Sequence, residues 1–366
     1  MSCDFIALAN IGIKELSPYQ AGKPIDELER ELGISNIVKL ASNENPLGPP
    51  QSVLDAMKLE AADICRYPDG NGFELKAAIC NKLSVKPEQI TLGNGSNDIL
   101  DLLAQVFLNS QTSAIYSQHG FVVYSIAVKA TGAQAIVTPA KDWGHDLPAM
   151  AAAVKANTRL VFIANPNNPT GTWVDEAAFK AFLDAVPEDV VVVLDEAYCE
   201  YVGDSGYPNS IALLNSYPNL VVTRTFSKAY GLAGLRVGYS ISNPQIADLL
   251  NRARGPFNVN SMALAAAKVV LADADYLADA IAVNNFGLKQ LADGFQHLGI
   301  NFIPSVGNFI SFDAGNDALV LYQNLLEAGV IVRPIGVYEM PNFLRVSVGL
   351  ADENQKFLAV LEQLIT

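Results

Sequence analysis

The middle of the chain alternates short apolar runs with amphipathic stretches, and this alternation determines the expected fold. The apolar runs that predict strands are Ile90–Leu92, Ala114–Tyr116, Ala135–Thr138, Leu160–Ala164, Val190–Leu194, Leu220–Thr223 and Val237–Ile241. Several of them are bounded by Gly, Pro or Asn, which favour turns. Val190–Leu194 shows no polar alternation, which is typical of a strand that is buried on both faces.

Helical patterns lie between these runs. Asn97–Phe107 places its apolar side chains on one helical face, and Asp175–Leu183 and Pro244–Ala253 have the same pattern. Strands that alternate with helices predict an α/β fold, in which a mostly parallel sheet is flanked by helices.

The last third of the chain has a different pattern. The long alanine-rich stretch Ser261–Gln296 is expected to be helical, and Phe309–Phe312 and Leu344–Val348 predict strands of a smaller α+β unit. The proline-rich N-terminal segment is expected to be irregular and to pack on that smaller unit. We therefore predict an N-terminal segment (residues 1–55), a large domain (56–265) and a small C-terminal α+β domain (266–366).

Length and composition fit a globular protein of more than one domain. The chain has 366 residues, of which 50% are hydrophobic, and a formal net charge of −14. No apolar run approaches the ~18 residues of a membrane span, and the first residues lack the basic region of a secretory signal. No basic stripe is present, so a nucleic-acid partner is not expected.

The cysteines and histidines point away from disulfide and metal chemistry. The four cysteines form no CxxC pair, which favours reduced thiols in a cytoplasmic protein. The three histidines occur in no HxxxH or HExxH spacing, so no metal site is expected.

Functional residues are expected where the strands end, because ligands of an open parallel sheet bind beyond the carboxyl ends of its strands. The first such segment runs from Gly93 to Asn97 and leads into a helix. Its glycines leave the backbone open, and a helix start offers free N–H groups to an anion. A simple turn with a helix cap explains this segment equally well. Asp98 replaces the third glycine of GxGxxG, and the chain has no GxxxxGK[ST] loop, so nucleotide-binding motifs are absent.

Two further strand ends carry polar groups. Leu160–Ala164 is followed by Asn165-Pro166-Asn167-Asn168-Pro169-Thr170-Gly171, whose prolines would hold amide side chains rigidly beside a planar ligand or merely stiffen a loop. Val190–Leu194 is followed by Asp195, Glu196 and Tyr198. A carboxylate after a fully apolar strand is costly unless it is paired, so a structural ion pair is an alternative to a ligand site.

The strongest chemical candidate follows Leu220–Thr223. Lys228 is the last residue of Arg224-Thr225-Phe226-Ser227-Lys228, with Arg236 and two glycines shortly downstream. Most lysines are solvated surface groups, but a buried lysine has a lowered pKa and attacks carbonyl carbons. An anion cradle, a buried carboxylate, a nucleophilic lysine and a second cation together are what pyridoxal phosphate requires.

These segments resemble a known family. The asparagine-proline loop, Asp195-Glu196-Ala197-Tyr198 and the segment from Ser227 to Gly238 are similar to fold-type I, pyridoxal-phosphate-dependent aminotransferases, over nearly the whole chain. Ala41-Ser42-Asn43-Glu44-Asn45-Pro46 and Arg66-Tyr67-Pro68-Asp69 resemble, within that group, the histidinol-phosphate aminotransferase family of histidine biosynthesis.

The resemblance implies an activity and a set of catalytic residues. The expected reaction is transamination of L-histidinol phosphate with 2-oxoglutarate, giving imidazole-acetol phosphate and glutamate. Lys228 would form a Schiff base with the cofactor, Asp195 would pair with its pyridinium nitrogen, and Tyr198 and Asn168 would hydrogen-bond its phenolic oxygen.

The resemblance also implies binding residues and a homodimer. The cofactor phosphate would be held by Gly95, Ser96, Asn97, Thr225, Ser227 and Arg236, with Tyr67 contributed by the neighbouring subunit. Phe121 would stack on the ring, and the substrate would meet Tyr19, Asn168, Arg333 and Arg345. Many relatives have an acidic residue at position 97 and tyrosine at position 121, and Asn97 and Phe121 depart from that pattern.

The sequence leaves three alternatives to this function open. Two are enzymes: an aromatic-amino-acid aminotransferase and a threonine-phosphate decarboxylase. The third is a non-enzymatic transcription regulator with an aminotransferase-like domain. It would need a DNA-binding extension, whereas this chain begins only ~90 residues before its first predicted strand.

Overall fold

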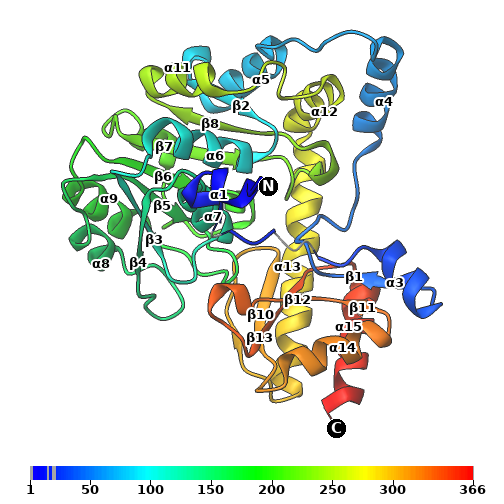
Figure 1. The fold of residues 1–366 in the computed structure, drawn as a ribbon. Helices are drawn as coiled ribbons and strands as arrows, with labels where there is room; N and C mark the ends of the chain where they lie inside the picture. The colour runs from blue at the N-terminus through cyan, green and yellow to red at the C-terminus, as the bar shows by residue number, and fades with distance from the viewer. Residues whose placement is uncertain (1–2, 15, 19–21, 366) are drawn as a thin grey trace.

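The structure, a computed structural model, describes residues 3–14, 16–18 and 22–365. Its largest element is a seven-stranded sheet with the order β2-β8-β7-β6-β5-β3-β4 (Figure 1). The strands are β2 (Ile90–Gly93), β3 (Ser113–Ser117), β4 (Gln134–Thr138), β5 (Thr158–Ala164), β6 (Val191–Asp195), β7 (Leu220–Thr225) and β8 (Gly238–Ser242). All seven predicted strands are confirmed within about two residues. Only β8 runs antiparallel to its neighbours in this sheet, so the prediction of a mostly parallel sheet is also confirmed.

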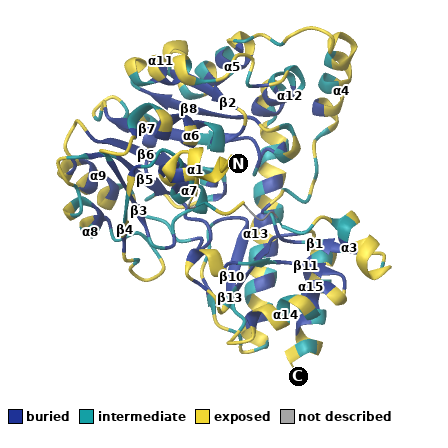
Figure 2. Ribbon diagram, viewed as in Figure 1, coloured by how far each residue is buried: buried dark blue, intermediate teal, exposed yellow. Residues whose placement is uncertain are grey.

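Helices cover both faces of this sheet. One face packs against α6 (Ser96–Phe107), α7 (Val122–Ala130) and α11 (Pro244–Ala253), and the other against α8 (Leu147–Ala152), α9 (Glu176–Ala185) and α10 (Ser210–Leu213). Strand β6 alternates between the two cores: Val191 and Val193 pack in the first, and Val192 and Leu194 in the second. The uninterrupted apolar run of β6 is explained by this two-sided burial. Figure 2 shows the buried strands between helices whose outer faces are exposed.

A third group of helices packs beside the edge strand β2. It consists of α4 (Gln51–Glu60), α5 (Phe73–Leu83) and α12 (Ser261–Ala272). Short 3₁₀ turns complete the connections: η1 (Ala61–Asp63), η2 (Pro87–Gln89), η3 (Cys199–Tyr201), η4 (Ala233–Leu235) and η5 (Gly336–Tyr338).

The C-terminal third forms the smaller α+β unit. Its antiparallel sheet has the order β12-β13-β10-β9 and consists of β9 (Phe302–Ile303), β10 (Phe309–Asp313), β12 (Arg333–Pro334) and β13 (Phe343–Ser347). Its core is shared with α13 (Ala274–His297), α14 (Ala318–Glu327) and α15 (Ala351–Ile365). None of the described helices is both long enough and apolar enough to cross a lipid bilayer.

The helical prediction over Ser261–Gln296 is confirmed, and the stretch is divided between two helices. Helix α12 ends at Ala272, α13 begins at Ala274, and Asp273 lies between them. The Asp273 carboxylate accepts a hydrogen bond from the backbone N–H of Tyr276, which caps the second helix. Alanine content alone does not reveal this break, whereas the capping aspartate does.

The N-terminal segment contacts both units. It contains α1 (Phe5–Leu8), α2 (Ile11–Lys14), α3 (Ile25–Leu32) and β1 (Val38–Lys39), so it is less irregular than expected. Strand β1 pairs with β11 (Val330–Ile331), and Leu28 of α3 packs beside them on the small unit. Helix α2 instead lies against α7 of the large unit. The domain limits at residues 55 and 265 stay a prediction.

The small unit should depend strongly on Phe295 of α13. This side chain is 0% exposed and packs against the rings of Phe302, Phe312 and Phe357. Phe295→Ala should lower the free energy of unfolding by about 3–5 kcal/mol, because it removes buried apolar surface and leaves a cavity. The midpoint of urea unfolding measures this loss.

Phe286→Ala is the matched control. Phe286 lies on the same helix but is 63% exposed, so its removal should change stability by less than about 0.5 kcal/mol. Equal effects of the two substitutions would contradict the assigned core.

Candidate active site

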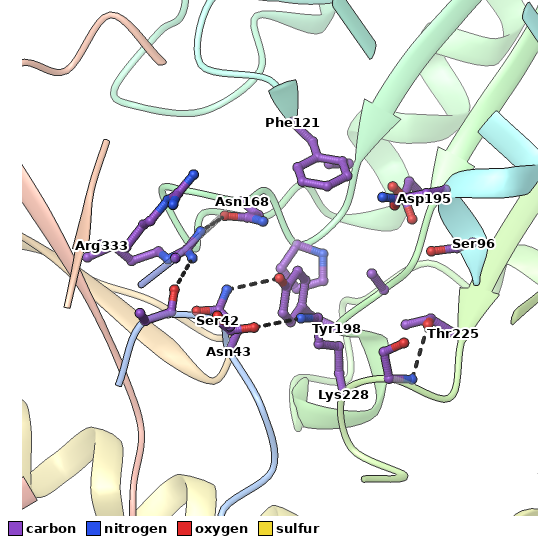
Figure 3. Close-up of a pocket in the computed structure, with 18 of the residues that line it drawn as sticks. Ser42, Asn43, Ser96, Phe121, Asn168, Asp195, Tyr198, Thr225, Lys228 and Arg333 are labelled. Atoms are coloured by element: carbon purple, nitrogen blue, oxygen red, sulfur yellow. Dashed lines mark hydrogen bonds between the residues drawn. The ribbon is translucent and has the colours of Figure 1, made fainter. Parts of the chain in front are cut away.

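A pocket lies at the carboxyl ends of β5, β6 and β7, where the small unit meets the large one. Most of the predicted site residues line it: Ser96, Asn97, Phe121, Asn168, Asp195, Tyr198, Thr225, Ser227, Lys228, Arg236, Arg333 and Arg345. In Figure 3, Phe121 and Lys228 lie on opposite sides of the cavity, as do Asp195 and Arg333. Residues from distant parts of the sequence therefore converge, and their individual roles stay predictions.

Two of the described residues that were predicted for the site, Gly95 and Tyr67, do not line this pocket. Gly95 lies directly against the guanidinium of Arg236, because a Cβ atom on Gly95 would be only 2.4 Å from Nη2 of Arg236. Tyr67 is 82% exposed and stacks on Phe257, with 4.7 Å between the ring centroids. Tyr19 lies outside the described residues.

Lys228 carries the reactive amine of the pocket. Its Nζ atom donates a hydrogen bond to the carbonyl oxygen of Ser42, at 3.1 Å. Withdrawal from water lowers the pKa of Lys228 to about 7; the cations Arg345 and Arg236 act in the same direction, and Glu44 opposes them. A large fraction of the amine is therefore neutral and nucleophilic near neutral pH.

Asp195 provides a buried carboxylate at the end of β6. Its Oδ2 accepts a hydrogen bond from the Tyr124 hydroxyl at 2.9 Å, and its Oδ1 accepts one from Thr223 at 3.0 Å. Burial raises the pKa of Asp195, and these two hydrogen bonds oppose that rise. Neither Tyr124 nor Thr223 was among the predicted site residues, although Thr223 directly pairs with Asp195 in the sheet.

The structural ion pair considered for this strand end exists, but at the next residue. Glu196 is fully buried, and its carboxylate lies 2.8 Å from the guanidinium of Arg224. No such ion pair links Asp195 to a cation among the described residues. Of the two neighbouring carboxylates, Asp195 is thus the one whose charge is left for a ligand.

An anion cradle surrounds the start of α6. Ser96 is the first residue of this 12-residue helix, so its N–H group is free of intrahelical bonds. A Cβ atom on Gly238 would lie 2.5 Å from the backbone nitrogen of Ser96, which explains why this strand begins with glycine. Arg236 supplies a cation on the other side, where it donates to the Ser227 hydroxyl at 3.2 Å. These groups suit a phosphate.

Two arginines of the small unit complete the pocket. Arg333 and Arg345 are directly paired across β12 and β13, so their side chains leave the same face of the sheet. Arg345 is buried and donates to Asn168 and to the carbonyl oxygen of Ala41, whereas its Nε has no acceptor among the described residues. Paired like charges are unfavourable, so this arrangement favours an anionic ligand.

A lysine of lowered pKa, a carboxylate without a cation and a phosphate-type cradle, placed at the strand ends of an α/β sheet, are the features of a cofactor-dependent transferase. Residues 35–361 match the family profile "Aminotransferase class I and II". The chain belongs to this family, and the predicted fold class and superfamily are confirmed.

Several proteins that are similar to this chain over nearly its whole length have the same name. The chain is 56% identical to histidinol-phosphate aminotransferase 2 of Pseudomonas fluorescens (strain Pf0-1), covering 100% of this chain and 99% of the relative. It is also 56% identical to the protein of that name from Pseudomonas aeruginosa, covering 99% of each. Among solved structures, the histidinol-phosphate aminotransferase of Sinorhizobium meliloti in complex with pyridoxal-5'-phosphate has a TM-score of 0.90 and 31% identity, covering 97% of this chain and 96% of that one.

The lowered pKa of Lys228 can be tested on the cofactor-free protein. As the pH rises through about 7, Lys228 should lose its proton and begin to react with an amine-acylating reagent. Arg345→Met should move the midpoint to higher pH, because it removes a neighbouring cation. Mass spectrometry of the Lys228 peptide measures the extent of labelling. A midpoint near the ordinary lysine value, unchanged by Arg345→Met, would contradict this account.

Proposed function

We propose that this protein is a pyridoxal-phosphate-dependent aminotransferase that converts L-histidinol phosphate and 2-oxoglutarate to imidazole-acetol phosphate and glutamate, in histidine biosynthesis. The single observation that carries the reaction class is the Lys228 amine, with its lowered pKa, in one pocket with the Asp195 carboxylate. The full-length similarity to proteins named histidinol-phosphate aminotransferase supports the substrate.

The residues present fit the cofactor. Gly238 lets β8 pack directly against the start of α6, where the free N–H group of Ser96 and the Arg236 guanidinium suit the cofactor's phosphate. Lys228 offers an amine for the cofactor's aldehyde carbon, and Asp195 offers a carboxylate for its ring nitrogen. Bound pyridoxal phosphate withdraws electrons from the substrate carbon that bears the amine, so that the proton on this carbon becomes acidic.

The side chains of the pocket then have distinct tasks. Lys228 would take the proton from the substrate carbon that bears the amine and deliver it to the former aldehyde carbon of the cofactor, on the other side of the nitrogen, for which a pKa near neutral is well suited. Asp195 keeps the ring nitrogen protonated by placing a negative charge beside it. Phe121 covers one face of the cavity and excludes water there. Tyr198 and Asn168 would hydrogen-bond the phenolic oxygen of the cofactor.

Substrate recognition is assigned to Arg333 and Arg345. A guanidinium binds phosphate and carboxylate with the same planar pair of donors. The pair can therefore bind the phosphate of histidinol phosphate in one half-reaction and a carboxylate of 2-oxoglutarate in the other. The direct pairing of the two arginines across β12 and β13 supports this assignment, because it places two cations on one face of the sheet beside the pocket.

We further propose a homodimer in which Tyr67 reaches the active site of the partner. Tyr67, Phe257 and Leu59 expose large apolar surfaces on the large unit, which favours a covering partner. All four cysteines carry free thiols, which supports a reducing compartment such as the cytoplasm.

A panel of amino donors tests the substrate. The ratio of kcat/KM for histidinol phosphate over phenylalanine should exceed one, because a phosphate gains a charged hydrogen bond from the arginine pair that phenyl lacks; such a bond contributes about 1.5–3 kcal/mol, or roughly 10- to 150-fold. A higher value for phenylalanine would replace this proposal by the aromatic-amino-acid aminotransferase. Release of carbon dioxide from threonine phosphate, without amino transfer, would indicate the decarboxylase.

Subunit exchange tests the shared site. Lys228→Ala protein should be nearly inactive, and Tyr67→Phe protein should be weakened. If Tyr67 acts in the partner's site, a hybrid dimer has one doubly damaged site and one intact site. Mixed subunits should then recover roughly a quarter of the wild-type activity, because about half of the dimers are hybrids. Activity that stays at the average of the two variants, or a monomer by light scattering, would exclude the shared site.

A further inference from the structure

Three parts of the chain that are distant in sequence meet at Tyr198 through one short run of hydrogen bonds. The backbone N–H of Asn43 donates to Oγ of Ser347 at 2.8 Å, and this hydroxyl donates to Oδ1 of Asn43 at 2.9 Å. Nδ2 of Asn43 then donates to the phenolic oxygen of Tyr198 at 3.0 Å (Figure 3). All three side chains are buried, so water does not compete for these bonds.

The donor and acceptor roles in this run are fixed by a count of protons. Ser347 has one hydroxyl proton, and its oxygen already accepts from the Asn43 backbone. Within the described residues, the only acceptor for that proton is Oδ1 of Asn43. The amide of Asn43 is therefore oriented with its oxygen toward Ser347 and its NH₂ group, which can only donate, toward Tyr198.

Because Tyr198 accepts from Asn43 at this position, its own proton must be directed elsewhere. We propose that Asn43 and Ser347 are positioning residues that fix the hydroxyl of Tyr198 as a donor into the pocket. The acceptor there is the phenolic oxygen of the bound cofactor, so this inference rests on the proposed function. Neither residue needs to touch a reacting atom, because both act through Tyr198.

The backbone explains why asparagine stands at position 43. Its φ angle is 54°, in the left-handed region that asparagine and aspartate tolerate better than most residues. Asn308 of the small unit also donates to the Asn43 carbonyl at 3.0 Å. The position of Asn43, and with it the direction of the Tyr198 proton, is thus set from the small unit.

Tyr201 of η3 packs beside Tyr198, and the other charged and titratable groups around Tyr198 belong to other elements. Lys228 Nζ lies 5.7 Å from the centre of its ring, and Arg345, Asp195 and Tyr338 also act on it. Burial raises the pKa of Tyr198 to about 12, so it is protonated across the working range. Substitutions at positions 43 and 347 leave these groups in place, and a change in pH behaviour can be compared with that of Tyr198→Phe.

The test is a pH titration of the absorbance of the bound cofactor in the holoenzyme. A donor at the phenolic oxygen weakens the hold of that oxygen on a nearby proton, so losing the donor should raise the pH of the spectral transition. Tyr198→Phe sets the full effect. Ser347→Ala and Asn43→Asp should each shift the transition upward by up to about one pH unit. Asn43→Asp keeps the shape and the left-handed backbone but cannot donate, and Ser347→Thr should restore the wild-type value.

A double variant separates the hydrogen bond from the added charge. In a Tyr198→Phe background, Asn43→Asp should add no further shift, because the proton it directs is gone. An equal shift in that background would mean that the charge acts directly, and this would overturn the inference. If Asn43→Asp does not fold, the pair Ser347→Ala and Ser347→Thr decides: without a shift and its rescue, the inference fails.

Two buried residues far from the pocket serve as controls. Asn219 donates to the carbonyl of Val190, and Ser113 shares a hydrogen bond with Thr158. Asn219→Asp and Ser113→Ala should leave the transition unchanged, and a general effect of buried substitutions would appear there. If Tyr198→Phe itself causes no shift, the assignment of Tyr198 fails and the inference fails with it. A shift for Tyr198→Phe alone would overturn only the inference.

Discussion

The burial of Asp195 is the constraint on which the rest of the site depends. A carboxylate at the end of a strand that is buried on both faces is costly unless its charge is met. Tyr124 and Thr223 supply hydrogen bonds to both of its oxygens, but neither supplies a positive charge. A protonated ring nitrogen can supply that charge, which links the packing of the sheet directly to the choice of cofactor. The charge of Glu196, the next residue, is instead met within the protein, because the guanidinium of Arg224 neutralises its carboxylate.

The same cations that prepare the pocket for anions also control Lys228. Arg345 and Arg236 both lower its pKa, because they repel its protonated form. A phosphate or carboxylate beside these guanidiniums would offset their charge, and we expect the affinity of Lys228 for protons to rise when such a ligand binds. The lysine is thus a nucleophile in the open site and becomes a stronger base once the site is filled. This change in the pKa of Lys228 follows from the charges of the neighbouring arginines and of the bound anion.

The sequence predicts the large sheet well and the contacts between the two units poorly. Apolar runs locate the seven strands, and parallel topology brings their polar ends to one edge, so Asn168, Asp195 and Lys228 could be grouped in advance. Asn43 and Ser347 could not, because 304 positions separate them and the motif that contains Asn43 does not indicate a contact with Ser347. The hydrogen bond of Tyr124 was not predicted for a related reason, because on α7 its side chain fits the pattern of buried apolar residues. Tyr67 cannot be judged within one chain, since its predicted contact lies in a second subunit.

The location of the site between the units follows from strand β13. Side chains alternate along a strand, so Arg345 and Ser347 leave the same face, two residues apart. Arg345 donates hydrogen bonds to Ala41 of the N-terminal segment and to Asn168 of the large unit. Ser347 donates to Asn43, which in turn donates to Tyr198. Movement of the small sheet would therefore change the positions of Arg345 and of Asn43 at the same time. If Arg345 binds an anionic substrate as proposed, a shift of its side chain on binding would act on the strand that also orients Asn43. Substrate binding and the direction of the Tyr198 proton would then be coupled through a single strand.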